Sequence, residues 1–440
     1  MKNIFVLYFY ISYSFLKCFL SQIIIPFERN FLYKNETFNF KNLIYNDLVI
    51  NISIGSEKQN IPLSLRFFVY PTFIIGKNNT EKLPYFNEEK SKTFSKNKTI
   101  QNFFFLPFTY GYDSNDSIFI NNKEINNFNF ILATELDQTK SNTTQSGIIG
   151  LNQEYCKINH KEIINKKNII NELKEKKIIS SYLFTIKYKE EDKGELIIGE
   201  YPHNYDKKNY NKDLYSEIRL NYFKNDYSRW QIIFDNVTYG NNEIKRGNNA
   251  IFSIEYGMLY STKNYKAMID KEFFSEYVKN FKCKFKEVNI EKSIKGDYLY
   301  YCDKDINISK LKKLTFFNRN LNMTFEFNYN DLFELHDDKY YFLVLMRKES
   351  DIWYLGKPFF KKYQLIFNQD NKVIGFYDYK KVIPSNNIFY FKLTVIIILI
   401  LVVIYLIYYI MKKRFLTKKK NKAQELDNND DDDYILYKDK

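Results

Sequence analysis

Residues Ile52 to Phe68 read ISIGSEKQNIPLSLRFF, and this stretch decides how the rest of the chain is interpreted. It begins inside the run Leu48 to Ile54, which is rich in the β-branched residues typical of strands. Between Lys58 and Thr80 the chain contains neither aspartate nor glutamate. Any reaction that needs a carboxylate in this stretch is therefore excluded.

The wider pattern predicts a mainly β chain. Short runs rich in Ile, Phe, Tyr and Val are separated by turns of Asn, Asp and Lys, whereas helical periodicity is rare. Residues 21–41 form either a short leader or the first strand. The expected strands include 48–54, 102–108, 182–188, 230–234 and 340–345, and the expected helices are 168–177 and 265–281.

Seven short segments carry a family resemblance. They are ISIGSEKQ (52–59), TYG (109–111), SGIIGL (146–151), GELIIG (194–199), WQIIFDNV (230–237), AIF (250–252) and WYLGKPFFKKYQLIFNQDNKVIGF (353–376). In order and spacing they resemble motifs of the pepsin-like aspartic proteases. The matching motifs are I-x-I-G-T-P-x-Q, the start of the flap, D-G-I-L-G-L, G-G-E-L-x-x-G, W-x-I-x-L-D-x-I, the A-I-V before the second Asp-Thr-Gly, and a closing segment that begins W-I-L-G-D.

The resemblance spans roughly Asn42 to Tyr379 and implies a bilobal pepsin-like fold. We expect a first lobe over 42–205 and a second over 218–380. A length of 440 residues is enough for two cores. With 13 Gly, 8 Pro and 19% aromatic residues, the composition is that of a folded chain.

The resemblance also locates the two catalytic positions, and neither carries an aspartate. In the family the first aspartate follows the motif glutamine by seven residues, which leads here to Arg66. The second Asp-Thr-Gly is replaced by Ser253, Ile254 and Glu255. Since the family's two carboxylates lie about 3 Å apart and share one proton, both are required. We therefore predict no intact catalytic pair, with Glu255 as the one displaced acid.

The residues at these positions cannot replace the missing acids. The guanidinium of Arg66 stays protonated and cannot act as a base. Ser253 has no activating histidine or lysine assigned near it. A shifted register that places Glu255-Tyr256-Gly257 on the second Asp-Thr-Gly would still leave the first site without an acid. Arg66 either extends out of the cleft without a role, or pairs with Glu255 or an anionic ligand group.

The resemblance places two further residues at the substrate cleft. Tyr110 occupies the flap tyrosine position, and Phe73 stands where the family has a hydrogen-bonding tryptophan. Phe73 lacks an N–H group, so that bond is lost. The interlobe cleft is still expected to accept an extended peptide or protein ligand by strand-like hydrogen bonds.

The cysteines and histidines favour an oxidising compartment and no metal. Cys283 and Cys302 bracket a loop, and an oxidising lumen would let them pair. The resemblance implies a disulfide at this place. The histidines are scattered without ligand spacing, so we expect surface histidines, no metal and no cofactor. They are His160, His203 and His336.

The two ends predict a membrane protein of type I topology. Residues 1–21 have the layout of a signal peptide. Residues 393–411 are uncharged and, at about 1.5 Å per residue, long enough for a bilayer core of about 30 Å. The lysines and arginine that follow place the tail, 412–440, in the cytosol. We therefore expect the ectodomain in the secretory pathway or at the cell surface.

Two further observations concern partners and modification. The formal charge is +14, but the lysines are dispersed without a basic stripe, so no nucleic-acid binding is expected. Nine Asn-x-Ser/Thr sequons permit glycosylation without demonstrating it. They are at Asn35, Asn51, Asn78, Asn97, Asn115, Asn142, Asn236, Asn307 and Asn322.

The leading hypothesis is a membrane-anchored pepsin-like pseudoprotease with a binding or scaffolding role. The rival is an active aspartic endopeptidase with displaced carboxylates. A third hypothesis is a structural receptor ectodomain whose cleft is filled by its own side chains.

Overall fold

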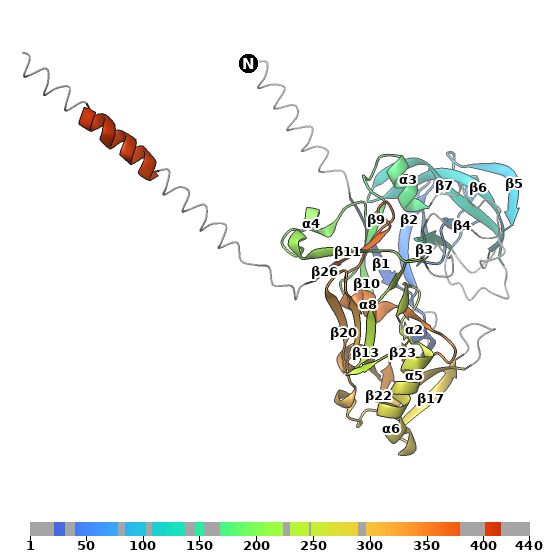
Figure 1. Cartoon of the computed structure of the whole chain (residues 1–440). Coiled ribbons are helices and arrows are strands. Elements are labelled where there is room, and N and C mark those ends of the chain that lie inside the picture. Colours follow the sequence, from blue (N-terminus) through green and yellow to red (C-terminus); the bar gives the residue numbers. More distant parts are fainter. Residues whose placement is uncertain are drawn as a thin grey trace, which may run out of the picture. The chain divides into compact units, whose positions relative to one another are not determined.

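The computed structural model describes residues 22–30, 40–77, 84–102, 108–136, 146–153, 168–222, 229–245, 248–288, 296–378 and 401–414. The chain divides into two compact units, Met1–Tyr379 and Lys380–Lys440. The first unit contains the strands and is mainly β (Figure 1). The expectation of a mainly β chain is therefore confirmed.

The strands of the first unit fall into two groups along the chain. The first group is β1 (Ile23–Arg29), β2 (Leu48–Ile54), β3 (Gln59–Arg66), β4 (Phe73–Ile75), β5 (Ser95–Asn102), β6 (Phe108–Ile120), β7 (Lys123–Leu136), β8 (Gly147–Gly150), β9 (Leu183–Tyr188), β10 (Lys193–Ile198) and β11 (Tyr215–Arg219). The second is β12 (Gln231–Ile233), β13 (Asn236–Tyr239), β14 (Asn242–Glu243), β15 (Asn249–Phe252), β16 (Leu259–Tyr260), β17 (Cys283–Val288), β18 (Asp297–Asp303), β19 (Leu314–Asn318), β20 (Met323–Phe327), β21 (Phe333–His336), β22 (Lys339–Phe342), β23 (Val344–Leu345), β24 (Ile352–Leu355), β25 (Ile366–Asn368) and β26 (Val373–Tyr377).

Helices are short and connect these strands. They are α2 (Phe40–Ile44), α3 (Ile169–Glu175), α4 (Pro202–Tyr205), α5 (Lys263–Ile269), α6 (Ser275–Lys279), α7 (Tyr329–Leu332) and α8 (Lys357–Lys362). The 3-10 turns are η1 (Glu88–Lys90), η2 (Lys212–Leu214) and η4 (Ile308–Lys310), and η3 (Asp270–Phe274) is a π-helical turn between α5 and α6.

One large sheet joins strands from the two ends of the unit. Its order is β11-β26-β25-β9-β10-β1-β2-β3-β8-β4-β7-β6-β5. The part from β11 to β1 is antiparallel throughout and draws β25 and β26 from the end of the unit. The second group otherwise forms three smaller sheets, β12-β15-β24-β16-β23, β14-β13-β19-β20 and β17-β18-β22-β21. The large sheet therefore ties the first and last strands of the unit together.

Most expected elements are found close to their predicted positions. The strand over 48–54 is β2 to the residue, and 182–188, 230–234 and 340–345 contain β9, β12 and β22 with β23. The helix over 168–177 is α3, with the Asn168 side chain accepting from the Asn171 amide at its start. The predicted helix 265–281 is interrupted by η3. The strand expected over 102–108 lies partly outside the described residues.

The ambiguous N-terminal segment contains a strand. β1 pairs with β10 and with β2, and Ile25 and Phe27 are each only 3% exposed. The alternation of Ile23, Ile25 and Phe27 toward the core explains why this segment forms a strand. Of the two alternatives left open for residues 21–41, the first strand is the one observed.

A buried lysine connects α8 with the β9–β10 turn. Lys357 Nζ lies 2.7 Å from Glu191 Oε1 and 3.1 Å from Asp192 Oδ1, and its side chain is only 6% exposed. Arg29 of β1 lies 3.1 Å from Asp192, and Lys361 also pairs with Glu191. Lys357 stands where the W-I-L-G-D motif has its aspartate. This ion-pair network fastens α8 to the large sheet.

Glu191 makes this network sensitive to acid. Burial raises its pKa, but hydrogen bonds and charges from Lys357 and Lys361 outweigh burial and lower the pKa from 4.5 to about 2. Because the folded pKa is the lower one, the stabilisation is complete above pH 4.5 and disappears as the pH falls through about 2. The network therefore remains charged in mildly acidic compartments.

We expect the unfolding free energy to decrease between pH 4.5 and about 2, and Glu191→Gln to flatten this part of the profile. Denaturant titrations at a series of pH values measure it. Asp338→Asn, which removes an exposed partner of Lys304, serves as the control and should leave the profile unchanged. Superimposable profiles for wild type and Glu191→Gln would contradict this role.

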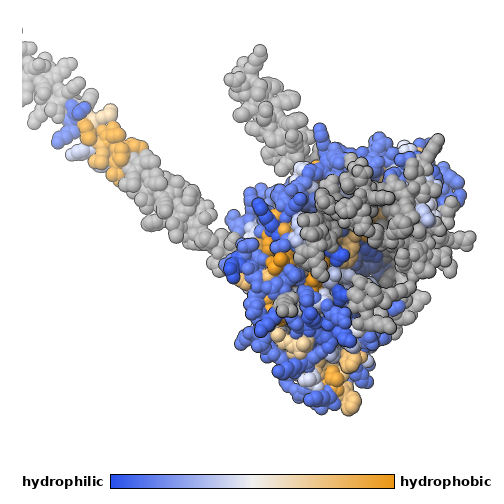
Figure 2. All heavy atoms as spheres, turned by 45° about the vertical axis from the view of Figure 1, so that its right-hand side comes forward, coloured by the Kyte–Doolittle hydropathy of each residue, from blue (hydrophilic) through white to orange (hydrophobic). Residues whose placement is uncertain are grey.

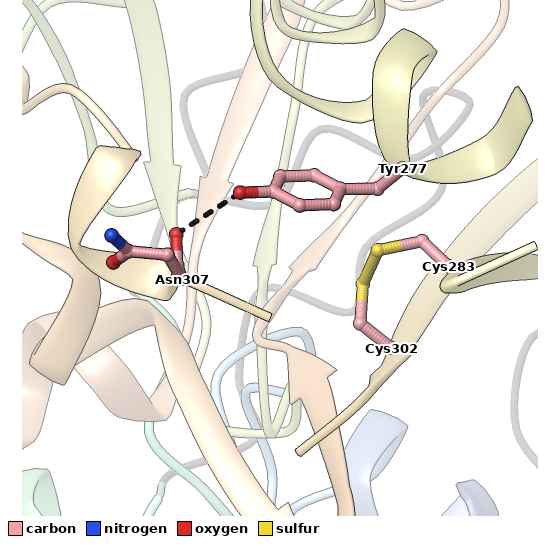
Figure 3. Close-up of a disulfide and its surroundings, with 4 residues drawn as sticks. All are labelled: Tyr277, Cys283, Cys302 and Asn307. Atoms are coloured by element: carbon pink, nitrogen blue, oxygen red, sulfur yellow. Dashed lines mark hydrogen bonds between the residues drawn. A yellow bond between two sulfur atoms is a disulfide. The ribbon is translucent and has the colours of Figure 1, made fainter. Parts of the chain in front are cut away.

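The predicted disulfide is present. Cys283 at the start of β17 and Cys302 in β18 are directly opposite each other and bonded (Figure 3). Both side chains are 1% exposed. The bond closes the loop that contains residues 289–295, which lie outside the described part.

Replacing both cysteines, Cys283→Ala with Cys302→Ala, should lower the unfolding free energy by about 3 kcal/mol, the loop-closure value for a separation of 19 residues. Chemical denaturation without reductant measures the loss. Adding reductant should lower the unfolding free energy of the wild type toward that of the double variant. The unfolding free energy of the double variant should not change. A wild type that does not respond to full reduction would contradict the prediction.

Among the described residues, no helix is long and apolar enough to cross a bilayer. The predicted span, 393–411, lies partly outside them, because only residues 401–414 of this region are described, as a helix. The predicted signal peptide, 1–21, lies wholly outside. Both remain predictions.

Candidate functional site

Arg66 ends β3 and forms an ion pair with Asp47, the residue just before β2. The Arg66 Nη2 to Asp47 Oδ1 distance is 2.9 Å, and the two side chains are 22% and 4% exposed. Ser64 Oγ donates a hydrogen bond to the same carboxylate oxygen. The positive charge of Arg66 is thus balanced by a carboxylate that directly precedes the neighbouring strand β2.

Sequence reasoning missed Asp47, although the hairpin register contains the signal. β2 and β3 pair antiparallel with Val49 opposite Ser64 and Ile54 opposite Gln59. Continuing that register by two residues places Asp47 opposite Arg66. The expected alternatives for Arg66 were a solvent-directed side chain or a pair with Glu255 or a ligand. The ion pair that the structure describes is with Asp47.

Glu255, which follows β15, contacts the residues that follow β3. Its Oε1 accepts from the backbone N–H groups of Phe67 and Phe68, the latter at 3.1 Å. Its Oε2 accepts from Ser253 Oγ at 2.7 Å. The Glu255 carboxylate, from the triplet Ser253-Ile254-Glu255, thus accepts hydrogen bonds from two backbone amides of the triplet Arg66-Phe67-Phe68.

Ser253 is enclosed and cannot meet a substrate. Its side chain follows β15, is 0% exposed, and donates its hydroxyl hydrogen to Glu255. A nucleophile must be accessible to the atom that it attacks. The prediction that Ser253 is not a nucleophile stays a prediction.

The main chain strengthens the junction at Glu255. Asn46 N–H donates to the Glu255 carbonyl at 2.8 Å, and Asn46 Nδ2 donates to the Ile254 carbonyl at 2.8 Å. Gly257 N–H donates to the Ile44 carbonyl, and a Cβ on Gly257 would lie only 2.0 Å from the Leu43 carbonyl oxygen. Only glycine permits so close a crossing of the two chains.

A buried tyrosine supports the same asparagine. Asn46 Nδ2 also donates to Tyr188 Oη at 2.8 Å. Burial raises the pKa of Tyr188, so its phenol stays neutral and accepts this bond. The Asn46 segment is thereby held to both β9 and the second triplet.

Aromatic residues occupy the rest of the first triplet. Phe67 is 1% exposed and packs edge-on against Phe360 and Phe367 at centroid distances of 5.6 and 4.9 Å. Phe68 lies 5.9 Å from the Tyr256 ring, and the Arg229 guanidinium lies 5.2 Å from the Phe68 centroid. Phe68 stands where the family has the glycine of its first Asp-Thr-Gly, so a ring stands where the family has no side chain.

The two predicted cleft residues have different environments. Tyr110 in β6 is 38% exposed, opposite Glu135 of β7. Phe73 in β4 is 0% exposed and belongs to a small apolar cluster with Ile131 and Ile148. Tyr110 is thus available to a ligand, whereas Phe73 contributes packing.

The histidines differ from the expectation of surface positions. His203 in α4 is 8% exposed and its Nδ1 lies 2.9 Å from Tyr377 Oη, so the surface expectation is wrong for this residue. Burial lowers the pKa of His203. His336 is half-buried beside Glu334, and His160 lies outside the described residues.

Within the described ranges, no group of three or more His, Cys, Asp or Glu residues has the arrangement of a metal site. A pocket of about 470 Å³ lies beside α8 and β21. Its lining includes Gly257 from the second triplet region but neither Arg66 nor Glu255. We assign no ligand to it.

The sequence profile of the eukaryotic aspartyl protease family matches residues 48–378. This match covers most of the chain, and the chain therefore belongs to the eukaryotic aspartyl proteases. The expected pepsin-like family is confirmed at this level. No curated protein sequence matches the chain significantly.

The contacts described here position chain segments, and shared-proton chemistry makes a further demand on the acids. That chemistry needs two facing carboxylates. The Oδ1 atom of Asp47 binds Arg66 and Ser64, and both oxygens of Glu255 accept hydrogen bonds from the protein. Three of the four carboxylate oxygens of these two acids thus have partners within the protein.

Truncation of Glu255 should destabilise the protein. Glu255→Ala leaves two amides and one buried hydroxyl without their acceptor, so we expect a loss of about 3 kcal/mol in unfolding free energy. Glu255→Gln keeps an acceptor for the amides and should lose only about 1 kcal/mol. Denaturant titration measures both, with Glu124→Ala at an exposed position as a control near zero. Equal losses for Ala and Gln would argue against an acceptor role.

A double-mutant cycle tests the Arg66–Asp47 pair. Removing either partner leaves a charge without compensation, so Arg66→Met and Asp47→Asn should each destabilise, with a coupling energy of about 2 kcal/mol. The same cycle with Arg66→Met and Glu255→Gln should give a smaller coupling. Additive losses for Arg66 and Asp47 would show that their contact contributes nothing to stability.

Proposed function

We propose that this protein is a catalytically inactive, membrane-anchored member of the aspartyl protease family. Its ectodomain binds or scaffolds a peptide or protein partner in the secretory pathway or at the cell surface. No cofactor or nucleic acid is involved. The observation that best supports the proposed inactivity is the Arg66–Asp47 ion pair at the position expected for the first catalytic aspartate. A guanidinium in an ion pair can neither activate water nor share a proton.

The second catalytic position supports the same proposal. Ser253 is buried, and its hydroxyl is committed to Glu255. Glu255 in turn accepts the amides of Phe67 and Phe68. A carboxylate that holds two chain segments together has a structural role that proteolysis does not require.

A protein with the family fold could still bind a ligand without the two catalytic carboxylates. Tyr110 is accessible on β6, and an extended peptide can be held by main-chain hydrogen bonds alone. The anchor is proposed from the uncharged residues 393–411 and the basic residues that follow them. Glycosylation of the sequons would accompany this topology.

The rival function is proteolysis by displaced acids, for which Asp47 and Glu255 are the candidates. We expect the full chain to show no pepstatin-sensitive cleavage of a peptide library between pH 3 and 6, under conditions in which pepsin is active. Mass spectrometry of the products measures cleavage. Pepstatin-sensitive products that disappear in Glu255→Gln and persist in Ser180→Ala, an exposed control, would establish the rival and overturn the proposal.

A further inference from the structure

An exposed aromatic residue occupies a helix end that normally favours glycine. α6 ends at Lys279 with Asn280 as its C-cap, and the next residue, Phe281, has a φ of 58°. The Phe281 amide donates to the Val278 carbonyl at 3.1 Å, and the Lys282 amide donates to the Tyr277 carbonyl at 2.9 Å. These two bonds define a Schellman motif, in which the left-handed residue is usually Gly or Asn.

Phe281 gains no burial in exchange for this conformation. Its side chain is 81% exposed, and Phe285 in the adjacent strand β17 is 53% exposed. A left-handed backbone is unfavourable for a residue with a Cβ, and an exposed phenyl ring adds apolar surface. Strain without a packing benefit points to a contact made outside the chain.

The backbone that carries Phe281 is firmly held. Tyr277 Oη donates to the Asn307 carbonyl at 3.4 Å, and the Cys283–Cys302 disulfide fixes the chain two residues beyond Phe281 (Figure 3). Tyr300 stacks on Phe274 at 3.9 Å. Presenting the ring from a fixed base reduces the entropy lost on binding.

Basic residues surround the two exposed rings. Residues 279–286 read KNFKCKFK, and no acid occurs from Tyr277 through Lys286. Lys282 already pairs with Asp305, and Lys286 Nζ lies 3.6 Å from the Phe40 ring centroid. Lys279 and Lys284 are exposed in the same segment, and the half-exposed Phe285 ring rests edge-on against Tyr298 and Tyr300. This region, residues 279–286, is called the aromatic–lysine tip below.

The position of the tip suits a planar surface. In Figure 1 α6 and β17 lie at the lower end of the globular unit, and Figure 2 shows apolar residues gathered at that end. β17 is also the outer strand of its sheet. A protruding end offers little enclosure to a folded partner, but it can enter a layer of lipid headgroups.

We propose that the aromatic–lysine tip inserts into the interface of a lipid bilayer. The Phe281 and Phe285 rings enter the boundary between headgroups and acyl chains, and Lys279 and Lys284 contact lipid phosphates. Aromatic rings favour this zone, and lysines reach from it to the headgroups. The tip would be a membrane contact separate from the proposed anchor. The contact itself does not depend on catalytic inactivity.

A tryptophan at the tip can report insertion, because both native tryptophans, Trp230 and Trp353, are buried at 1% and 0% exposure. The full chain with Phe281→Trp is reconstituted into vesicles of phosphatidylcholine with phosphatidylserine. We expect a blue-shifted emission and quenching by lipids with brominated acyl chains. Lys279→Gln and Lys284→Gln should each lower the ratio of molecules with an inserted tip to molecules with a free tip about fivefold in these vesicles.

The matched control is Leu335→Trp. Leu335 is 52% exposed but lies on β21, at the opposite edge of the same sheet. Its emission should be quenched much less than that of Phe281→Trp. Equal quenching at both positions would indicate non-specific adsorption and overturn the proposal. A blue shift at position 281 that needs no lipid but grows with protein concentration would identify a second copy as the partner and overturn it as well.

Phe281→Gly provides a test that does not depend on the tryptophan variant folding. Glycine adopts the left-handed conformation without strain, so the denaturant midpoint of the Phe281→Gly variant should shift upward. Membrane docking of the same variant, followed through a tryptophan introduced by Phe285→Trp, should be lost. Unchanged docking would overturn the proposal. Flotation of the wild type with vesicles after carbonate treatment tests the transmembrane anchor separately. The result therefore distinguishes an absent transmembrane anchor from a tip that does not insert.

Discussion

The Glu255 carboxylate is the contact on which the junction between the two halves of the unit depends. It receives the amides of Phe67 and Phe68 from one half and the Ser253 hydroxyl from the other. Asn46 reinforces the crossing through the Glu255 and Ile254 carbonyls. A charged acceptor for several donors is stronger than a neutral one, so Glu255 binds the segment after β3 firmly to the segment after β15.

The fold was largely predictable because its signals are local. The Ile–Phe–Tyr–Val runs and the order of the seven motifs identify the strands and the family, and the family profile matches residues 48–378. The π-helical turn at Asp270–Phe274 was not predictable, because the apolar spacing of residues 265–281 suits a continuous helix. The burial of His203 was also missed, since its partner Tyr377 lies 174 residues away.

The site was predictable in position but not in its contacts. Counting from Gln59 located Arg66, and the motif before Ser253 located Glu255. The partner of Arg66 was not predicted, because Asp47 lies 19 residues earlier in the chain and meets Arg66 only once the β2–β3 hairpin forms. The buried Lys357 was likewise hidden in a motif position where the family has an aspartate, and its compensation by Glu191 and Asp192 comes from a distant turn.

The hydrogen bond between Ser64 and Asp47 fixes the surroundings that a new side chain at position 66 would meet. An aspartate introduced at position 66 would face Asp47 with no guanidinium between them and would stand beside the amides that already bind Glu255. Like charges at such a distance repel, so a single reversion creates crowded anions instead of a working couple. A facing pair of carboxylates built on position 66 would therefore require coordinated changes at positions 47, 253 and 255 as well.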